Sequence, residues 1–161
     1  MKIVTITGHK NTKKDYIASK LAENSDVEFI KPYVDVELPK GIEPEEFGEY
    51  HIVLPAVMDD MIRDEKVICI TEIENRRYVF FDFQLTADYN ILIVDDYGVM
   101  LIKEKYDDVY SILLKSKNQK PSKRVLEFLT PTEFDEVFDV DNDDIDELEV
   151  RIAWQDPHRY A

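Results

Sequence analysis

A buried-type strand near the N-terminus leads through a glycine into a helical segment. Residues 2–6 (KIVTI) are rich in β-branched side chains, which is typical of a parallel-sheet strand with both faces covered. Gly8 ends this run, and between Thr12 and Asn24 the apolar residues fall on one stripe of a helix. Such a βα unit predicts an α/β fold, a parallel sheet flanked by helices.

The rest of the chain continues the alternation of strands and helices. Strands are expected at 27–30, 51–53, 67–73, 76–81, 89–94, 109–114 and 136–140, and helices at 55–64, 98–106, 122–128 and 143–154. The proline-containing stretch 31–50 is expected to be loop-rich. Glu74-Asn75 is expected to be a hairpin turn, so this middle region predicts a small mixed β sheet inserted into the larger fold.

Composition indicates one globular domain over residues 1–161. Four glycines and no linker-like stretch leave no obvious point of division in 161 residues, a length that can bury a core without a metal or disulfide. Within this domain we expect a core of 1–30 and 88–155, an insertion of 31–87, and a lysine-rich, exposed and mobile loop at 115–123.

The formal net charge of −15 bears on the partners. Such a surface repels phosphate and argues against general nucleic-acid binding. It still allows a local basic pocket, and it also allows an acidic surface that imitates DNA. The simplest interpretation is that the charge maintains solubility.

Cysteine content and hydropathy indicate the cellular compartment of the protein. A single cysteine, Cys69, cannot form an internal disulfide and is expected to be a buried apolar residue, and we see no signal peptide. The longest apolar runs are strand-length, so no membrane association is expected. We therefore expect a cytoplasmic protein.

The first strand–helix turn is the most informative motif. Residues 8–15 (GHKNTKKD) have the length and position of the P-loop pattern G-x-x-x-x-G-K-[ST]. Gly8 and Lys14 match, but Lys13 replaces the second glycine and Asp15 replaces the magnesium-binding hydroxyl. A lysine side chain is expected to fit poorly in the tight turn. The candidate phosphate-binding residues are Gly8, His9, Lys10, Lys13, Lys14 and Asp15.

Motifs along nearly the whole chain resemble those of guanylate kinases and related nucleoside-monophosphate (NMP) kinases. The similar segments are 49–53 (EYHIV), 67–78 (VICITEIENRRY), 91–99 (ILIVDDYGV), 109–114 and 140–145 (VDNDDI). The resemblance implies a P-loop kinase fold with an NMP-binding-type insertion at 31–87 and a short lid. It also implies ATP and Mg²⁺ as cofactors if kinase activity survives, and otherwise no certain cofactor.

Carried over residue by residue, the resemblance keeps part of the NMP site. Tyr50 and Tyr78 stand at positions of phosphate-holding tyrosines, and Asp95 stands at a base-reading aspartate. An ungapped alignment gives Leu38 and Gly41 for the phosphate-clamping arginines, whose bidentate grip neither residue can replace. The other replaced positions are Val34 and Phe80 for two hydroxyl residues, Cys69 for the base-reading glutamate, and Ile93 for an acidic residue that helps to organise magnesium.

Other charged residues could compensate for these losses. In the insertion they include Glu72, Arg76 and Arg77, for which the sequence offers no structural explanation beyond exposure on a hairpin. In the lid-like segment, which in the family neutralises the transferred phosphoryl group, they are Lys117, Lys120 and Arg124.

The acidic stretch 139–149 does not fit a calcium loop. Counted from Asp139, an EF-hand needs glycine at the sixth position and glutamate at the twelfth, where this chain has Asp144 and Val150. We expect no metal site here, and instead expect Asn142 to cap the last helix with acidic residues on its first turn.

Together these features favour a guanylate-kinase-like protein with a degenerate P-loop and NMP site. It would act as a binding or regulatory module for a nucleotide or an unidentified protein partner, without ordinary GMP kinase activity. The first alternative is a divergent nucleoside or deoxynucleoside monophosphate kinase using ATP, and the second is an acidic DNA-mimic inhibitor. Such divergence in a short chain suggests a viral or mobile-element origin.

Overall fold

The computed structural model describes the backbone of residues 1–37, 50–120 and 126–154, and the side chains of these residues up to Ile152. The chain divides into two compact units, each described separately below. The larger unit comprises Met1–Phe29 and Ala87–Ala161, and the smaller comprises Ile30–Thr86.

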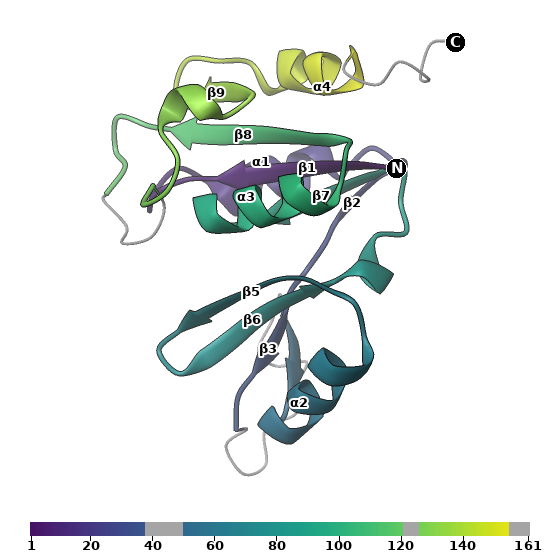
Figure 1. Ribbon diagram of the computed structural model, residues 1–161. Coiled ribbons are helices and arrows are strands. Elements are labelled where there is room, and N and C mark those ends of the chain that lie inside the picture. The colour runs from purple at the N-terminus through teal and green to yellow at the C-terminus, as the bar shows by residue number, and fades with distance from the viewer. Residues whose placement is uncertain (38–49, 121–125, 155–161) are drawn as a thin grey trace. The chain divides into compact units, whose positions relative to one another are not determined.

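The larger unit is built on a five-stranded parallel sheet (Figure 1). Its strands, in spatial order, are β2 (Val27–Phe29), β7 (Tyr89–Ile93), β1 (Lys2–Thr7), β8 (Val109–Lys115) and β9 (Glu136–Asp139). Every residue of the central strand β1 is buried, as its β-branched composition predicts. The predicted α/β fold with a parallel sheet is confirmed.

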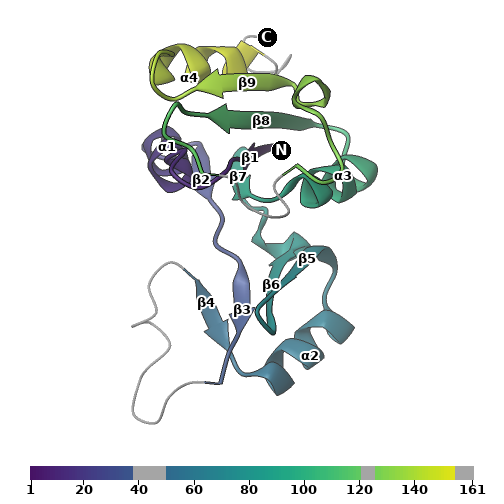
Figure 2. The same ribbon diagram turned by 90° about the vertical axis from the view of Figure 1, so that its left-hand side faces the viewer.

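Helices cover both faces of this sheet (Figure 2). They are α1 (Lys14–Leu21), α3 (Asp96–Lys105) and α4 (Ile145–Trp154). Ile17, Ala18 and Leu21 of α1 pack with Leu148 and Ile152 of α4 in the main core. On the other face, Val99 of α3 packs with residues that include Leu113 and Phe134, which follows the 3₁₀ turn η3 (Pro131–Glu133).

The smaller unit contains a four-stranded mixed sheet and one helix. Its strands, in spatial order, are β4 (His51–Val53), β3 (Tyr33–Asp35), β6 (Arg76–Phe81) and β5 (Val67–Ile73), with helix α2 (Pro55–Asp64) and the 3₁₀ turn η2 (Asp82–Gln84). β3 is parallel to β4 and antiparallel to β6. Met58 of α2 is buried against Val79 and Phe81 of β6, so the helix and one sheet face form a small core.

Three sequence-based expectations are wrong in this fold. Residues 33–35 form β3 rather than a loop. The expected helix at 122–128 is absent over 126–128, the described part of that range, because the N–H of Phe128 donates to a carboxylate of α3. The last helix begins at Ile145, where Asp144 and not Asn142 acts as the cap, since its carbonyl accepts from Leu148 and its Oδ1 accepts from Asp146.

Candidate functional site

The turn between β1 and α1 requires glycine at its first position. Gly8 is buried, and a Cβ atom placed there would lie 2.4 Å from Thr12 Oγ1, closer than non-bonded atoms approach. That hydroxyl donates to the carbonyl of His9 at 2.7 Å, which closes the turn on itself. Close packing therefore accounts for the one glycine of the P-loop pattern that this sequence retains.

The second glycine position of the pattern also has a glycine-type conformation, although lysine occupies it. Lys13 precedes α1 with φ 59° and ψ 38°, in the left-handed region, and Asn11 has φ 66°. The lysine is accommodated with its side chain exposed. The unfavourable conformation of a non-glycine residue remains.

Lys13→Gly should raise the free energy of unfolding by up to about 1 kcal/mol, because glycine adopts this conformation without a Cβ penalty. Lys13→Ala is the matched control, since alanine removes the same charge and keeps the Cβ. Urea denaturation of the three proteins measures the effect. Equal stability of the glycine and alanine variants would show that Lys13 is not strained.

The side chain of Lys14 folds back over the turn. Its Nζ is half-buried and donates to the carbonyl of Gly8 at 2.9 Å. Burial lowers the pKa of Lys14, and the neighbouring Asp15 carboxylate partly opposes this shift. The side chain of Lys13 makes no capping hydrogen bond, so the N–H groups of the first turn of α1 receive no acceptor from it. A helix N-terminus with a cation beside it favours a bound anion.

The middle of the lid-like segment lies beside this turn. The N–H of Lys120 donates to the carbonyl of Lys10 at 3.0 Å, and Asn11 Nδ2 donates to the carbonyl of Asn118 at 3.4 Å. The start of the segment is held by Asp141, whose Oδ2 accepts from Ser116 Oγ at 3.0 Å and from the N–H of Lys117 at 2.8 Å.

These contacts bear on the expectation that the lysine-rich segment 115–123 is an exposed and mobile loop. Lys115 is the last residue of β8 and does not belong to the loop. Lys117 and Lys120 are exposed, as expected, but the backbone at both is hydrogen-bonded to the rest of the unit. Arg124 lies outside the described residues, as do Leu38 and Gly41.

Asp95 and Asp96 have separate structural tasks at the start of α3. Asp95 caps the helix, because its Oδ1 accepts from the N–H of Gly98 at 2.8 Å. Asp96 is fully buried, and its Oδ2 accepts from the N–H groups of Phe128 and Leu129 at 2.5 and 2.8 Å. The sequence interpretation missed Asp96, and the only signal for it was its place beside Asp95 in the pair DD.

Two NMP-site candidates of the smaller unit contact each other. The rings of Tyr50 and Tyr78 meet edge to face with centroids 5.7 Å apart, and Tyr50 remains 45% exposed. Phe80 is buried on the same strand as Tyr78, opposite Cys69, which is also buried as expected. Asp95 belongs to the larger unit, so its convergence with the tyrosines on one base site stays a prediction.

Arg77 has a structural role that the sequence did not reveal. Its backbone N–H and its Nε each donate to the carboxylate of Asp35, which is 6% exposed, at 2.5 Å. A second nitrogen lies 2.7 Å from Asp59 Oδ1, and a third reaches the carbonyl of Pro55 at 3.2 Å. The guanidinium therefore joins β3, β6 and α2. It already has its carboxylate partners, whereas Arg76 on the same strand is exposed.

The described residues include neither a metal-binding cluster nor a membrane-spanning helix. Over 1–37, 50–120 and 126–152, no three His, Cys, Asp or Glu side chains are arranged to hold a metal ion. In the same part of the chain, none of the helices has the length and apolar character needed to cross a membrane.

Comparison with known proteins supports the fold. A crystal structure of guanylate kinase from Anaplasma phagocytophilum matches with a TM-score of 0.63 and 19% identity, over 94% of this chain and 82% of that one. A sugar kinase from Janibacter sp. HTCC2649 gives a TM-score of only 0.46 at 14% identity, over 99% and 97% of the two chains, too low for any argument. No protein-family model and no curated protein sequence matches the chain. The chain thus has a guanylate-kinase-like fold, and identity this low shows nothing further.

Proposed function

We propose that this protein is a guanylate-kinase-like binding module that holds phosphate groups at the β1–α1 turn without ordinary GMP kinase activity. The observation that carries the proposal is the position of Lys14, whose ammonium lies 2.9 Å from the carbonyl of Gly8 beside the start of α1. The ligand would be a nucleotide, or a protein partner that presents an anionic group to the same turn.

Local electrostatics favour an anion at this turn despite the net charge of −15. Lys10 and Lys13 are exposed in the turn, and the backbone of Lys120 is hydrogen-bonded to it. Burial makes the free Lys14 ammonium less stable than in water, as its lowered pKa indicates. A bound phosphate would compensate for that lost hydration, so binding and the protonated form of Lys14 would stabilise each other.

The same residues argue against ordinary phosphoryl transfer. Asp15 is exposed on the first turn of α1, where the P-loop pattern has a hydroxyl that ligates magnesium. Its carboxylate would repel a phosphate there unless a metal ion lay between them. Arg77 is paired with Asp35 and Asp59, so it could replace a missing phosphate-clamping arginine only by giving up these contacts.

Nucleotide binding should be detectable as a thermal shift that depends on Lys14. A ligand at about 100 times its dissociation constant adds about 2.7 kcal/mol to the stability of the folded state. We expect a shift with nucleoside triphosphates or diphosphates, tested with and without Mg²⁺, and its loss in Lys14→Ala. Lys20→Ala is the matched control, because Lys20 lies in the last turn of the same helix.

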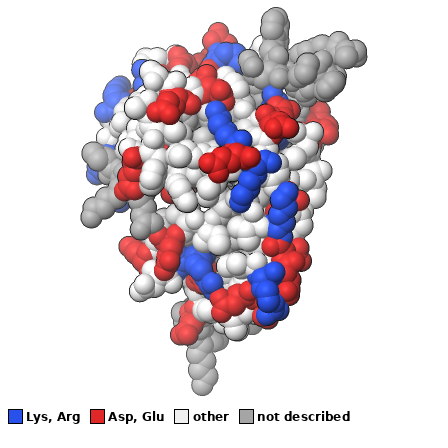
Figure 3. Space-filling model, viewed as in Figure 1, with Lys and Arg blue, Asp and Glu red and all other residues white. Residues whose placement is uncertain are grey.

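The outcomes distinguish this proposal from its competitors. Equal shifts in the Lys14 and Lys20 variants would contradict phosphate binding at the turn. A triphosphate series without any shift, together with a protein partner whose binding also ignores Lys14, would contradict the proposal altogether. A partner lost only on neutralising the acidic stretch 139–149 would favour the DNA-mimic alternative. On the face shown in Figure 3, acidic and basic side chains are interspersed rather than gathered by sign.

Phosphate affinity should also fall as the pH rises toward the alkaline range. The pKa of Lys14 is below its ordinary value of 10.5 in the free protein, so the ammonium loses its proton earlier than an exposed lysine would. Since the bound anion prefers the charged form, binding should weaken from below pH 10.5, and Lys14→Arg should remove most of this dependence because arginine stays charged. Titrations at several pH values measure it, and an unchanged pH profile in the arginine variant would exclude Lys14 as the titrating group.

A further inference from the structure

The larger unit has a polar cavity at the edge of its sheet opposite the β1–α1 turn. The cavity has a volume of about 260 Å³ and is lined by Lys2, Asp107, Asp108, Val109, Tyr110 and Asp135. These residues lie at or next to the amino ends of the parallel strands β1, β8 and β9, whereas the turn follows the carboxyl end of β1. The volume is just below the roughly 300–1,000 Å³ of typical small-ligand sites.

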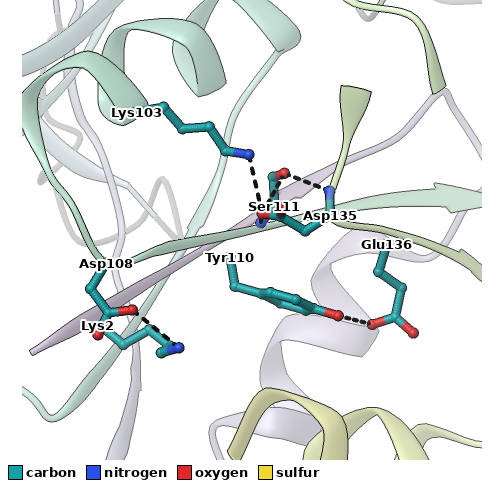
Figure 4. Close-up of polar contacts among 7 residues, drawn as sticks. All are labelled: Lys2, Lys103, Asp108, Tyr110, Ser111, Asp135 and Glu136. Atoms are coloured by element: carbon teal, nitrogen blue, oxygen red, sulfur yellow. Dashed lines mark hydrogen bonds and ion pairs between the residues drawn. The ribbon is translucent and has the colours of Figure 1, made fainter. Parts of the chain in front are cut away.

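Lys2 contributes a buried charge with unused hydrogen-bonding capacity. Its side chain is 3% exposed, and its Nζ lies 3.1 Å from Asp108 Oδ1 (Figure 4). An ammonium has three N–H donors, and this ion pair is the one polar contact of Lys2 Nζ within the described part of the chain. Buried donors are normally satisfied, so the remaining donors are available to an acceptor of a bound water or ligand.

The carboxylates of the cavity also have oxygens available. Asp135 Oδ2 accepts from the N–H and Oγ of Ser111 at 2.8 and 3.1 Å, and from Lys103 Nζ at 3.1 Å (Figure 4). Its Oδ1 has no contact among the residues described, and neither has the carboxylate of Asp107. Tyr110 is already engaged, because its hydroxyl donates to Glu136 Oε2 at 2.8 Å.

We propose that this cavity binds a small ligand that carries a guanidinium or amine together with an oxygen acceptor, the chemistry of a free basic amino acid. The three carboxylates lie against two ammonium groups, those of Lys2 and Lys103, and the remaining negative charge favours a ligand with a net positive charge. The cationic group would take the available oxygens of Asp107 and Asp135. The ligand's carboxylate would accept the remaining N–H groups of Lys2, which an amine without an acceptor would leave unsatisfied.

Three related ligands test the two halves of this recognition on the whole chain. L-arginine has both groups, L-citrulline replaces the guanidinium with a neutral urea, and agmatine lacks the carboxylate. We expect saturable L-arginine binding by calorimetry, with shifts of the Val109 and Tyr110 amide signals in NMR spectra. Compared with L-arginine, L-citrulline should bind at least about tenfold more weakly, and agmatine should bind about threefold more weakly.

Matched variants distinguish the effect of local contacts on L-arginine binding from the effect of the overall negative charge. Asp107→Asn and the double variant Asp107→Asn/Asp135→Asn should weaken L-arginine binding about threefold and about tenfold. The control is Glu104→Gln/Glu127→Gln, which changes the net charge equally at two exposed positions of the same unit and should leave affinity within about twofold. Asp107→Asn alone keeps every described contact, so its effect does not depend on an altered fold.

Each result decides part of the proposal. Binding lost in the Asp107 and Asp135 variants but kept in the glutamate control supports the site. Absence of saturable L-arginine binding at millimolar concentration would overturn it. Equal weakening of L-arginine binding in the aspartate variants and in the glutamate control would show that only the overall negative charge attracts the ligand. That result would also overturn the proposal. Agmatine binding as tightly as L-arginine would overturn the role of Lys2. None of these outcomes depends on Lys14, so they are distinguishable from those of the nucleotide test.

Discussion

Replacing Arg77 with methionine should lower the free energy of unfolding of the smaller unit by about 3–5 kcal/mol, the cost of leaving a buried charge without its partner. The charge left behind is the carboxylate of Asp35, which is 6% exposed and receives both the backbone N–H and the Nε of Arg77. Asp59 is 66% exposed and water can replace its contact, so its share of the loss is small.

The adjacent arginine supplies the control for this experiment. Arg76 is exposed on the same strand and its side chain makes no polar contact within the described residues, so Arg76→Met should change stability by less than about 0.5 kcal/mol. Hydrogen exchange of the β3 and β6 amides, read by NMR in urea, reports on the smaller unit directly. Equal losses in the two variants would show that the Asp35 pair contributes nothing specific.

The different roles of Arg76 and Arg77 determine which substitutions can map the binding surface of a partner on the β5–β6 hairpin. Reversing the charge at both arginines would put a third carboxylate beside Asp35 and Asp59, and binding would then be lost because the unit unfolds. Arg76 is exposed on the same hairpin, so a substitution at this position tests a binding role without that ambiguity.

Local signals predicted the smaller unit well. Pro55 at the first helical position places α2 at its observed bounds, and Glu74 and Asn75 have the positive φ values, 51° and 64°, of a tight hairpin turn. β3 was missed because its three residues follow a proline and carry no periodic signal. Its stability comes from pairing of Tyr33 with His51 and Val79, partners that are distant in the sequence.

The same limit applies to the candidate site. The strand, Gly8 and helix of the β1–α1 turn are contiguous, so the pattern in the sequence was sufficient to predict them. The role of Arg77 depends on Asp35, which is 42 residues away, and that of Asp96 depends on N–H groups 32 and 33 residues away. A single sequence does not reveal these pairings, so side chains that look like free functional groups in the sequence can belong to structural networks.

With ATP, Mg²⁺ and GMP, the protein should show no turnover in the range of roughly 1–10³ s⁻¹ that is typical of enzymes. Arginines that neutralise a transferred phosphoryl group are worth about 10³–10⁵ in rate, and the lid-like segment carries lysines at 117 and 120. The resemblance also aligns Leu38 and Gly41 with the arginines that clamp the substrate phosphate, and neither can replace a bidentate guanidinium. A coupled ADP assay and ³¹P NMR, with an active guanylate kinase as positive control, measure the rate. Turnover within that range, with GMP or another nucleoside monophosphate, would establish the divergent-kinase alternative.

A double variant separates the loss of phosphate binding from the loss of catalysis. Lys13→Gly/Asp15→Ser restores the complete P-loop pattern, which removes the left-handed lysine and the carboxylate at the position of the magnesium-binding hydroxyl. We expect nucleotide affinity to rise about tenfold, because one repulsive charge is replaced by a hydroxyl that can ligate magnesium. GMP phosphorylation should remain absent, since the phosphate-clamping arginines are still missing. If turnover appeared, the P-loop substitutions alone would account for the inactivity, and the NMP site would have to be functional as it stands.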